Sequence, residues 1–250
     1  MKKLILTFSL LGALLSTNAQ TISEIKSSSE HIEGSSRSGS SFNQDSEQLK
    51  RIRGILKLNV FDYYELYEKY DTDLKKKVFI NSDEYRTKLT ELENKKNELK
   101  KTLYCFDFQP SYSERKYDIA YDLNSKTFKV MQIINSDDFY NNPNYVQFDQ
   151  IVFKCPVGIK INKKKEYFSG GGYCIIQDII FKIEEEKLAI KIEENRMSLM
   201  FLFVFKFTDA IPFEGMFLGS GKITKYALAN TLEKVILYNS GTGEIYQTFK

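Results

Sequence analysis

The spacing of apolar residues divides the chain into a helical first half and a β-rich second half. Leu49, Ile52 and Leu56 recur at the spacing of one helix face. Residues 81–84, Asn-Ser-Asp-Glu, provide a cap and acidic residues for a helix start. A long charged helix over 83–104 is predicted to follow, with one seam spaced by four and three: Tyr85, Leu89, Leu92, Lys96, Leu99 and Leu103. Together these patterns predict helices over 47–104.

After Cys105 the pattern changes to short runs typical of β-strands. Residues 117–134 predict a hairpin that turns at Leu-Asn-Ser-Lys. Residues 145–154 and 173–183 are predicted strands, joined by a polar, glycine-rich connection. Residues 184–196 fit either a strand or a helix, and their content of Glu, Lys, Leu and Ala favours a helix.

The segment 197–207 is apolar on both of its faces, which predicts a central strand covered on two sides. One face carries Phe201, Phe203, Phe205 and Phe207, and the other carries Met200, Leu202 and Val204. The last residues, 235–249, predict a second hairpin around Asn-Ser-Gly-Thr-Gly. The predicted fold class is therefore α+β, with N-terminal helices packed on a mostly antiparallel sheet. Residues 47–250 form one predicted domain, with a helical arm over 47–104 and a β-rich part over 105–250.

The first residues predict a secretory signal peptide. Lys2 and Lys3 precede an apolar run over 4–15, and a Thr-Asn-Ala stretch predicts cleavage between Ala19 and Gln20. The run is shorter than the roughly 20 residues that span a bilayer, so no transmembrane segment is expected in the mature chain. We expect a periplasmic or secreted protein.

Residues 20–46 are rich in Ser, Gly, Glu and Asn, and they contain few large apolar residues. Such a composition buries too little apolar surface to offset the entropy of ordering, so it predicts a disordered linker. The only histidine of the chain, His31, lies in this segment without a partner near in sequence. We therefore expect no role for it in a site.

The charge of the mature chain is close to neutral. Removing Lys2 and Lys3 from the 36 basic residues leaves 34, against 33 acidic residues. A nucleic-acid partner is therefore not expected, because the chain lacks the usual excess of positive charge.

Four tyrosines occur close together in the helical part, and they form the one candidate binding surface of the sequence: Tyr63, Tyr64, Tyr67 and Tyr70. Their rings can pack on an amphipathic helix with the hydroxyls in water, or they can stack on a ligand. Both interpretations are compatible with the spacing.

The three cysteines, Cys105, Cys155 and Cys174, allow at most one bridge. Cys155 and Cys174 stand at the ends of two predicted strands, and antiparallel neighbours would bring these ends together. The alternatives are a disulfide between Cys155 and Cys174, which an oxidising compartment permits, and buried thiols that pack as small apolar groups.

The catalytic patterns that we tested do not fit this chain. Gly219–Lys222 lacks the first glycine and the Ser or Thr of a phosphate-binding loop, and Asp71-Thr72-Asp73 lacks the later ligands of a calcium loop. A Ser-His-Asp triad or a Cys-His pair needs a histidine, and the predicted domain contains none. The sequence therefore indicates no catalytic, cofactor-binding or metal-binding residue.

Two short stretches carry a resemblance to other proteins. Residues 121–124, which lead to 128–130, and residues 192–196, which lead into the Phe-rich strand, resemble uncharacterised exported bacterial proteins of the domain-of-unknown-function type. This resemblance implies neither an activity nor a site.

These observations favour a non-catalytic extracytoplasmic module that binds a protein or an envelope component. One alternative is a carrier of an apolar ligand such as a lipid, enclosed by the aromatic-rich sheet. A second alternative is a hydrolase that uses Asp or Glu without histidine, since carboxylates from distant segments can converge.

Overall fold

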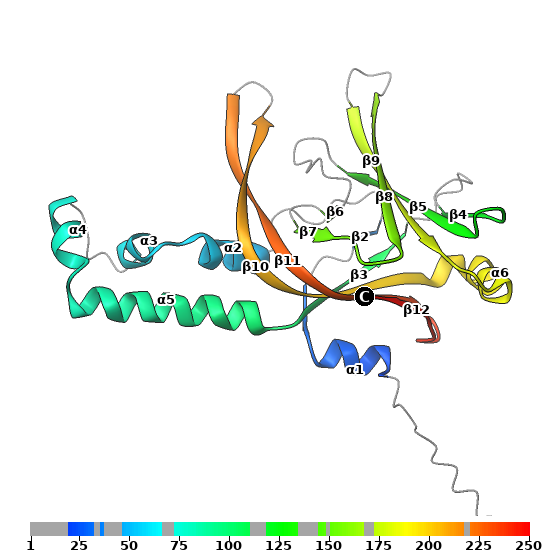
Figure 1. Cartoon of the computed structure of the whole chain (residues 1–250), viewed down its shortest axis with the longest axis horizontal. Helices are drawn as coiled ribbons and strands as arrows, with labels where there is room; N and C mark the ends of the chain where they lie inside the picture. The colour runs from blue at the N-terminus through cyan, green and yellow to red at the C-terminus, as the bar shows by residue number, and fades with distance from the viewer. Residues whose placement is uncertain are drawn as a thin grey trace, which may run out of the picture.

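The α+β fold class is confirmed by a computed structural model (Figure 1). The structure describes residues 20–32, 36–37, 47–66, 73–110, 119–134, 145–148, 151–167, 173–217 and 221–250. The helices within residues 47–101 extend to one side of two β-sheets, which are mostly antiparallel. The predicted signal peptide, with Ala19 at its cleavage point, lies outside the described residues, which begin at Gln20.

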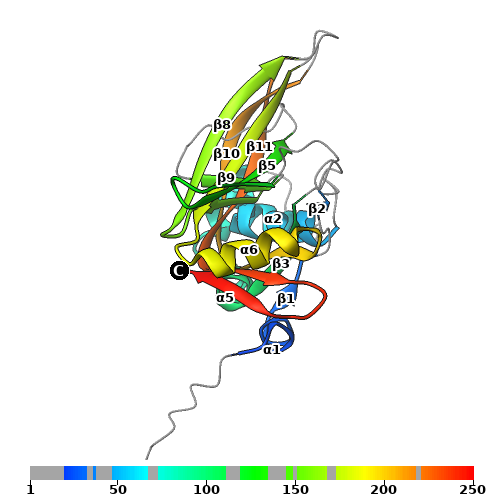
Figure 2. The same ribbon diagram turned by 90° about the vertical axis from the view of Figure 1, so that its right-hand side faces the viewer.

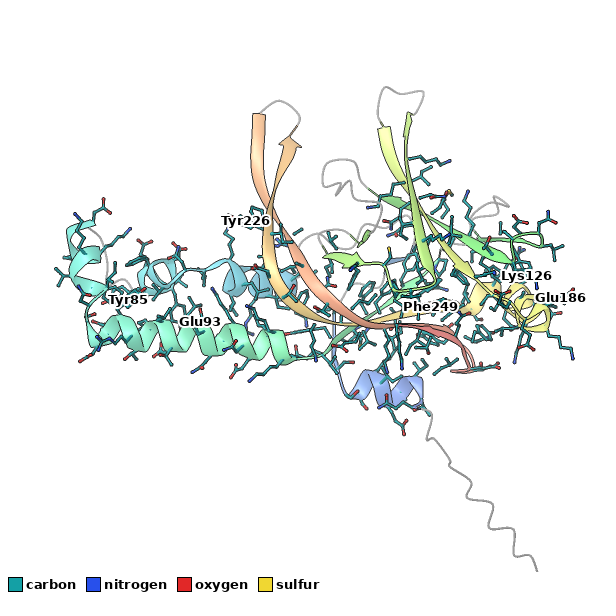
Figure 3. All side chains as sticks on the ribbon, in the orientation of Figure 1. Tyr85, Glu93, Lys126, Glu186, Tyr226 and Phe249 are labelled. Carbon is teal, nitrogen blue, oxygen red and sulfur yellow. The ribbon has the colours of Figure 1, made fainter. Side chains whose placement is uncertain are left out.

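The predicted helical arm consists of α2 (Glu47–Lys57), α3 (Val60–Glu65), α4 (Asp73–Phe79) and α5 (Asp83–Lys101). The start of α5 is where the sequence predicts it, because the Ser82 hydroxyl accepts a hydrogen bond from the Tyr85 amide at 3.1 Å. The helix ends at Lys101 rather than 104, since Thr102 adopts an extended backbone. Figure 3 shows Tyr85 and Glu93 on the part of α5 that extends away from the sheets.

The larger sheet has the strand order β1-β3-β10-β11-β7-β6, with β12 paired to β11 and β2 paired to β3. Its long strands are β10 (Leu199–Phe217) and β11 (Gly221–Asn239), which form one curved hairpin. The short strands are β1 (Glu30–His31), β2 (Ser36–Arg37), β3 (Tyr104–Gln109), β6 (Tyr145–Phe148), β7 (Ile151–Lys154) and β12 (Ile245–Phe249). The predicted central strand is confirmed, since β10 pairs with β3 on one side and β11 on the other.

The smaller sheet has the order β4-β5-β9-β8. Its strands are β4 (Ile119–Asp122), β5 (Thr127–Ile134), β8 (Ile159–Tyr167) and β9 (Tyr173–Lys182). The predicted hairpin over 117–134 is confirmed by β4 and β5, with Lys126 at φ 54° in the turn. The ambiguous segment after β9 is a helix, α6 (Glu186–Glu194), followed by the short 3-10 turn η2 (Arg196–Ser198).

The two sheets enclose the main core. We call the face of β10 that carries Phe201, Phe203, Phe205 and Phe207 the front face; these four side chains are buried there. The Phe203 ring stacks on Phe106 of β3 with centroids 4.9 Å apart, and Phe181 of β9 meets Phe201 edge-on at 5.5 Å. Phe249 of β12 closes the core beside Phe181 (Figure 3). Aromatic side chains from both sheets therefore hold the sandwich together.

The opposite, rear face of β10 is covered by the helix α1 (Ile22–Ser27), which lies below the sheet in Figure 2. Ile22 and Ile25 pack there against Leu202 and Val204. The prediction of a disordered linker is thus wrong for residues 20–32. A capping box at Thr21 starts α1, and Ile32 lies fully buried after β1, so these few apolar residues are well placed to order the segment.

Strands β6, β7 and β8 differ from the prediction. The predicted strand over 145–154 contains two strands that pair antiparallel, 145–148 and 151–154, and the polar connection contains β8. Ile159 and Ile161 of β8 face inward and pack in the core. The lysines of β8 make this segment polar overall, so the sequence did not indicate a strand. Because β8 is an edge strand paired only with β9 among the described strands, charged residues suit it.

Candidate functional site

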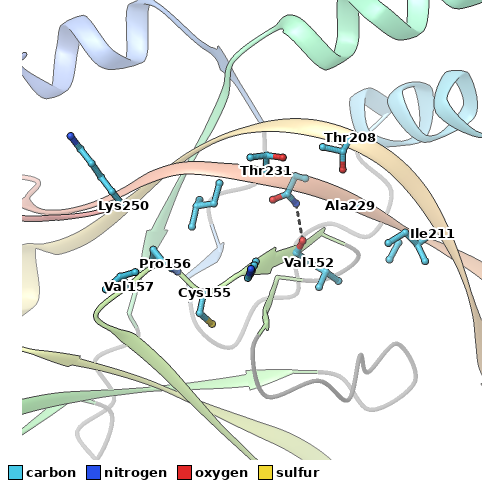
Figure 4. A pocket seen from close by; sticks show the side chains of 13 residues that line it. Val152, Cys155, Pro156, Val157, Thr208, Ile211, Ala229, Thr231 and Lys250 are labelled. Carbon is cyan, nitrogen blue, oxygen red and sulfur yellow. Dashed lines mark hydrogen bonds between the residues drawn. The ribbon is translucent and has the colours of Figure 1, made fainter.

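A groove of about 480 Å³ lies where β7, β10 and β11 meet the end of the chain (Figure 4). Most of its walls are apolar, and we call it the β7–β11 groove. Its apolar lining consists of Val152, Pro156, Val157, Ile211, Ala227, Ala229 and Leu232. Its polar lining consists of Lys154, Cys155, Thr208, Asn230, Thr231 and Lys250. The volume lies within the range of roughly 300–1,000 Å³ that is typical of small-molecule sites.

The floor of the groove depends on a parallel pairing between β7 and β11. Leu228 pairs with Ile151 and Ala229 with Val152. The Asn230 side-chain amide donates to the Val152 carbonyl oxygen at 2.9 Å, which fastens the end of this pairing. Small side chains at Ala227 and Ala229 leave the space that a larger residue would fill.

One wall comes from the turn between β7 and β8. Gly158 has a φ of 91°, and a Cβ there would lie 3.3 Å from the Phe249 ring, so glycine suits this position. The Val157 amide donates to the Lys250 carbonyl oxygen at 3.2 Å and ties the turn to the end of the chain. Val157 itself is 86% exposed. A side chain of this kind on a groove edge is apolar surface available to a ligand.

The other wall belongs to the β10–β11 hairpin. The register shifts between Phe207 and Asp209, so Thr208 is an extra residue in β10. Figure 4 shows Thr208 and Thr231 close together on this wall, with Ile211 farther along it. Ile211 is 43% exposed, and its partner Ala227 is buried. The groove is therefore apolar along its length, with hydroxyl groups on one side.

A second polar cluster lies beneath α1 around the buried Asp107 of β3. The Lys26 ammonium donates to Asp107 Oδ2 at 2.7 Å, and the Tyr238 hydroxyl donates to Asp107 Oδ1 at 2.7 Å. His31 Nε2 lies 3.3 Å from the same Oδ2. His31, predicted to lie in a disordered linker, is instead brought to Asp107 by β1.

Burial controls the ionisation of the groups around this cluster. Burial, and then the hydrogen bond to Asp107, raises the pKa of Tyr238 far above its ordinary value. Burial also raises the pKa of the Cys105 thiol. A thiol with a raised pKa is a poor nucleophile, because the thiolate is the reactive form. These features are those of a structural ion pair that joins α1 to the sheet.

Of the two alternatives for the cysteines, the bridge between Cys155 and Cys174 does not fit this strand order. Cys155 follows β7 in the larger sheet, whereas Cys174 pairs with Glu166 near the far end of the β8–β9 hairpin. The intervening strand β8 is what the sequence prediction missed, and Cys155 carries a thiol. That thiol lines the β7–β11 groove.

The predicted tyrosine surface is wrong for its first two members. Tyr63 and Tyr64 are buried, and the Tyr64 ring packs 4.2 Å from Phe79 of α4. The Tyr63 hydroxyl reaches Glu91 of α5 at 3.4 Å. Tyr67 and Tyr70 lie outside the described residues. Ring packing between α3 and its neighbours is therefore the correct interpretation for Tyr63 and Tyr64.

The arm also has a groove, of about 1000 Å³, between α2, α3 and α5. Its lining mixes Leu66 and Leu92 with charges of both signs, such as Glu98, Lys95 and Arg51. Leu66 on its edge is 68% exposed. The arm therefore keeps an accessible surface, although the charges on it select no single class of ligand.

Comparisons with protein-family models, with curated proteins and with solved structures find no match to this chain. Among the residues that the structure describes, no three His, Cys, Asp or Glu side chains are grouped as metal ligands. Within the same residues, none of the helices combines the length and apolar character needed to cross a bilayer.

Proposed function

We propose that this protein is an exported binding protein without chemistry of its own, which holds a small apolar ligand in the β7–β11 groove. The observation that carries the proposal is the groove itself. The groove has a volume of about 480 Å³, and its apolar walls include the exposed Val157 and Ile211. Apolar ligands bind to such surfaces because contact removes apolar area from water.

The position of the groove also supports this proposal. Its floor belongs to inner strands of the larger sheet, and its walls belong to a turn and a hairpin. Ligand sites are commonly formed by loops that a regular scaffold positions. The cluster around Asp107 is a weaker candidate, since both of its carboxylate oxygens are occupied by residues that fasten α1.

Export remains part of the proposal, and it rests on the signal-like residues 1–19. A binding protein outside the cytoplasm has access to ligands of the envelope or the medium. This proposal narrows the sequence-based hypothesis of a general binding module to one site.

The proposal is tested by filling the groove. Ala229→Phe places a ring in the space beside Val152, whereas Ala120→Phe adds the same ring to the exposed Ala120 of β4. Calorimetric titration of the mature chain with 1-decanol should give binding in the wild type and in Ala120→Phe. Binding to Ala229→Phe should be weaker by at least about tenfold, since roughly 1.4 kcal/mol of lost contact gives that factor.

Thermal unfolding of each variant shows whether the fold survives the added ring. A wild-type protein that takes up no 1-decanol would refute the proposal without reference to any variant. Equal binding by the wild type and a folded Ala229→Phe would place the ligand elsewhere.

A further inference from the structure

We infer that the ligand of the β7–β11 groove is the anion of a single-chain fatty acid, an inference that rests on the proposed function. An apolar groove alone does not distinguish hydrocarbons, alcohols and acids. The charges and hydrogen-bond donors around it make that distinction.

The charged side chains that line the groove have one sign. They are Lys154 and Lys250, and no Asp or Glu side chain is among the described residues that line it. Neither ammonium group forms an ion pair with a side chain in the part of the chain that the structure describes. A carboxylate head group would therefore meet two ammonium groups and no acidic side chain of the described lining. Lys250 also carries the α-carboxylate at the end of this chain, so the ammonium of Lys154 is the less compensated of the two.

Two acidic residues next to the groove in sequence are already engaged. Asp209, beside Thr208, accepts a hydrogen bond from the Ala210 amide at 2.8 Å. Glu233 lies 3.3 Å from the Lys206 ammonium. Their negative charge is thus partly compensated locally, and Lys154 and Lys250 remain to act on a ligand.

Hydroxyl groups supply further donors for an anion. Thr208 and Thr231 lie near each other on the hairpin wall, both exposed, and each can donate one hydrogen bond. Lys250 lies at one end of the groove, with its side chain directed outward in Figure 4. Its long stem allows the ammonium to turn toward a bound head group while the stem covers apolar surface.

The size of the groove suits a ligand with one acyl chain. Its volume of about 480 Å³ lies in the lower part of the range of roughly 300–1,000 Å³ that is typical of small-molecule sites. Decanoate and dodecanoate are ligands of that class.

The inference is tested with two ligands that differ only in the head group. Decanoate and 1-decanol are titrated separately into the mature chain by calorimetry, below their aggregation concentrations and at low ionic strength. The wild type should bind decanoate about fivefold more tightly, the scale that one or two exposed ion pairs provide. Raising the salt concentration should reduce the difference, because salt screens exposed charges.

Substitutions test whether the two lysines cause the difference in affinity between decanoate and 1-decanol. Lys154→Met with Lys250→Met should make the two affinities equal, while leaving 1-decanol binding within about twofold. Lys160→Met removes an exposed lysine of β8 that does not line the groove, and it should keep the preference for decanoate. These substitutions are at exposed positions, so each variant is expected to fold.

The possible outcomes separate this inference from the proposed function. Equal affinities in the wild type, or tighter binding of 1-decanol, would overturn the fatty-acid inference and leave the apolar site standing. A preference for decanoate that survives in the double variant would also overturn it. If neither ligand binds, both proposals fail.

Discussion

The two faces of the larger sheet are covered in different ways, although the same strands form both. On the front face, phenylalanines of β10 pack against rings from β3, β7 and β9. On the rear face, Leu202 and Val204 are covered by α1, a six-residue helix from a Ser-rich segment. The front cover is a second sheet, while the rear cover is held by a few isoleucines and one ion cluster. A strand that is apolar on both faces therefore indicates that both faces are buried, and it does not indicate what buries them.

The largest expected effect comes from comparing substitutions on the two faces of β10. Phe203→Ala removes a ring that packs between Phe106 and Phe153, and it should lower the free energy of unfolding by about 4 kcal/mol. Leu202→Ala, at the next position on the rear face, should cost about 3 kcal/mol. Urea unfolding at fixed pH measures both values. A larger loss for Leu202→Ala than for Phe203→Ala would show that the rear face is the better packed one.

An intermediate effect is expected from the ion cluster that holds the rear cover. Asp107→Asn keeps the shape of the side chain but weakens its bonds to Lys26 and the buried Tyr238 hydroxyl. We expect a loss of about 2 kcal/mol in unfolding free energy, the scale for hydrogen bonds to a charged group. Amide hydrogen exchange over residues 22–27 should accelerate as well.

The control for this substitution is Asp83→Asn. It removes the same charge at an exposed position of α5, where Asp83 meets Arg86, and should cost less than about 0.5 kcal/mol. If Asp107→Asn leaves exchange in α1 unchanged, the cluster does not fasten the helix.

The smallest effect concerns Tyr104, a buried residue of the front face. Burial, followed by the nearby charge of Glu30, raises the pKa of Tyr104 to about 12. The folded state thus keeps a proton that the unfolded state loses above about pH 10, and stability falls as the pH rises between these values. Between pH 9 and pH 11 this residue alone should lower the unfolding free energy by about 1 kcal/mol.

Comparison with Tyr104→Phe isolates this contribution, since phenylalanine does not ionise. Urea unfolding at pH 9 and pH 11 should show a smaller pH dependence in the variant by about that amount. Identical pH dependence in both proteins would mean that the Tyr104 hydroxyl titrates in the folded state as it does in the unfolded chain.

The fold was predictable from sequence wherever local patterns decide the structure. The cap at Ser82, the turn at Lys126 and the two apolar faces of β10 depend on neighbouring residues, and each is found where expected. By contrast, α1 is ordered by contacts with residues far away in sequence, so its composition alone pointed to disorder. Strand β8 was not predicted because the three successive lysines at 163–165 interrupt its alternation of apolar and polar residues.

The groove was not predictable for a related reason. Its residues come from 152–157, 208–211, 227–232 and the last residue, and each of these segments appears ordinary by itself. They meet through the parallel pairing of β7 with β11, which joins segments more than 70 residues apart. No local pattern in the sequence indicates such a pairing, whereas residues that stood out in the sequence, such as His31 and Tyr63, form structural contacts.

The position of α1 also determines the order in which parts of the chain can fold. Lys26 meets Tyr238 across 212 positions of sequence, and β1 pairs with β3 in parallel, so the first described segment waits for the last strands. Contacts of such long range slow folding, because the intervening chain must be ordered first. A chain made from its N-terminus cannot close its rear face until the residues around Tyr238 have been made. The predicted signal peptide implies that the chain crosses a membrane unfolded. Because α1 covers the rear face late, the chain would stay unfolded more easily until it has crossed.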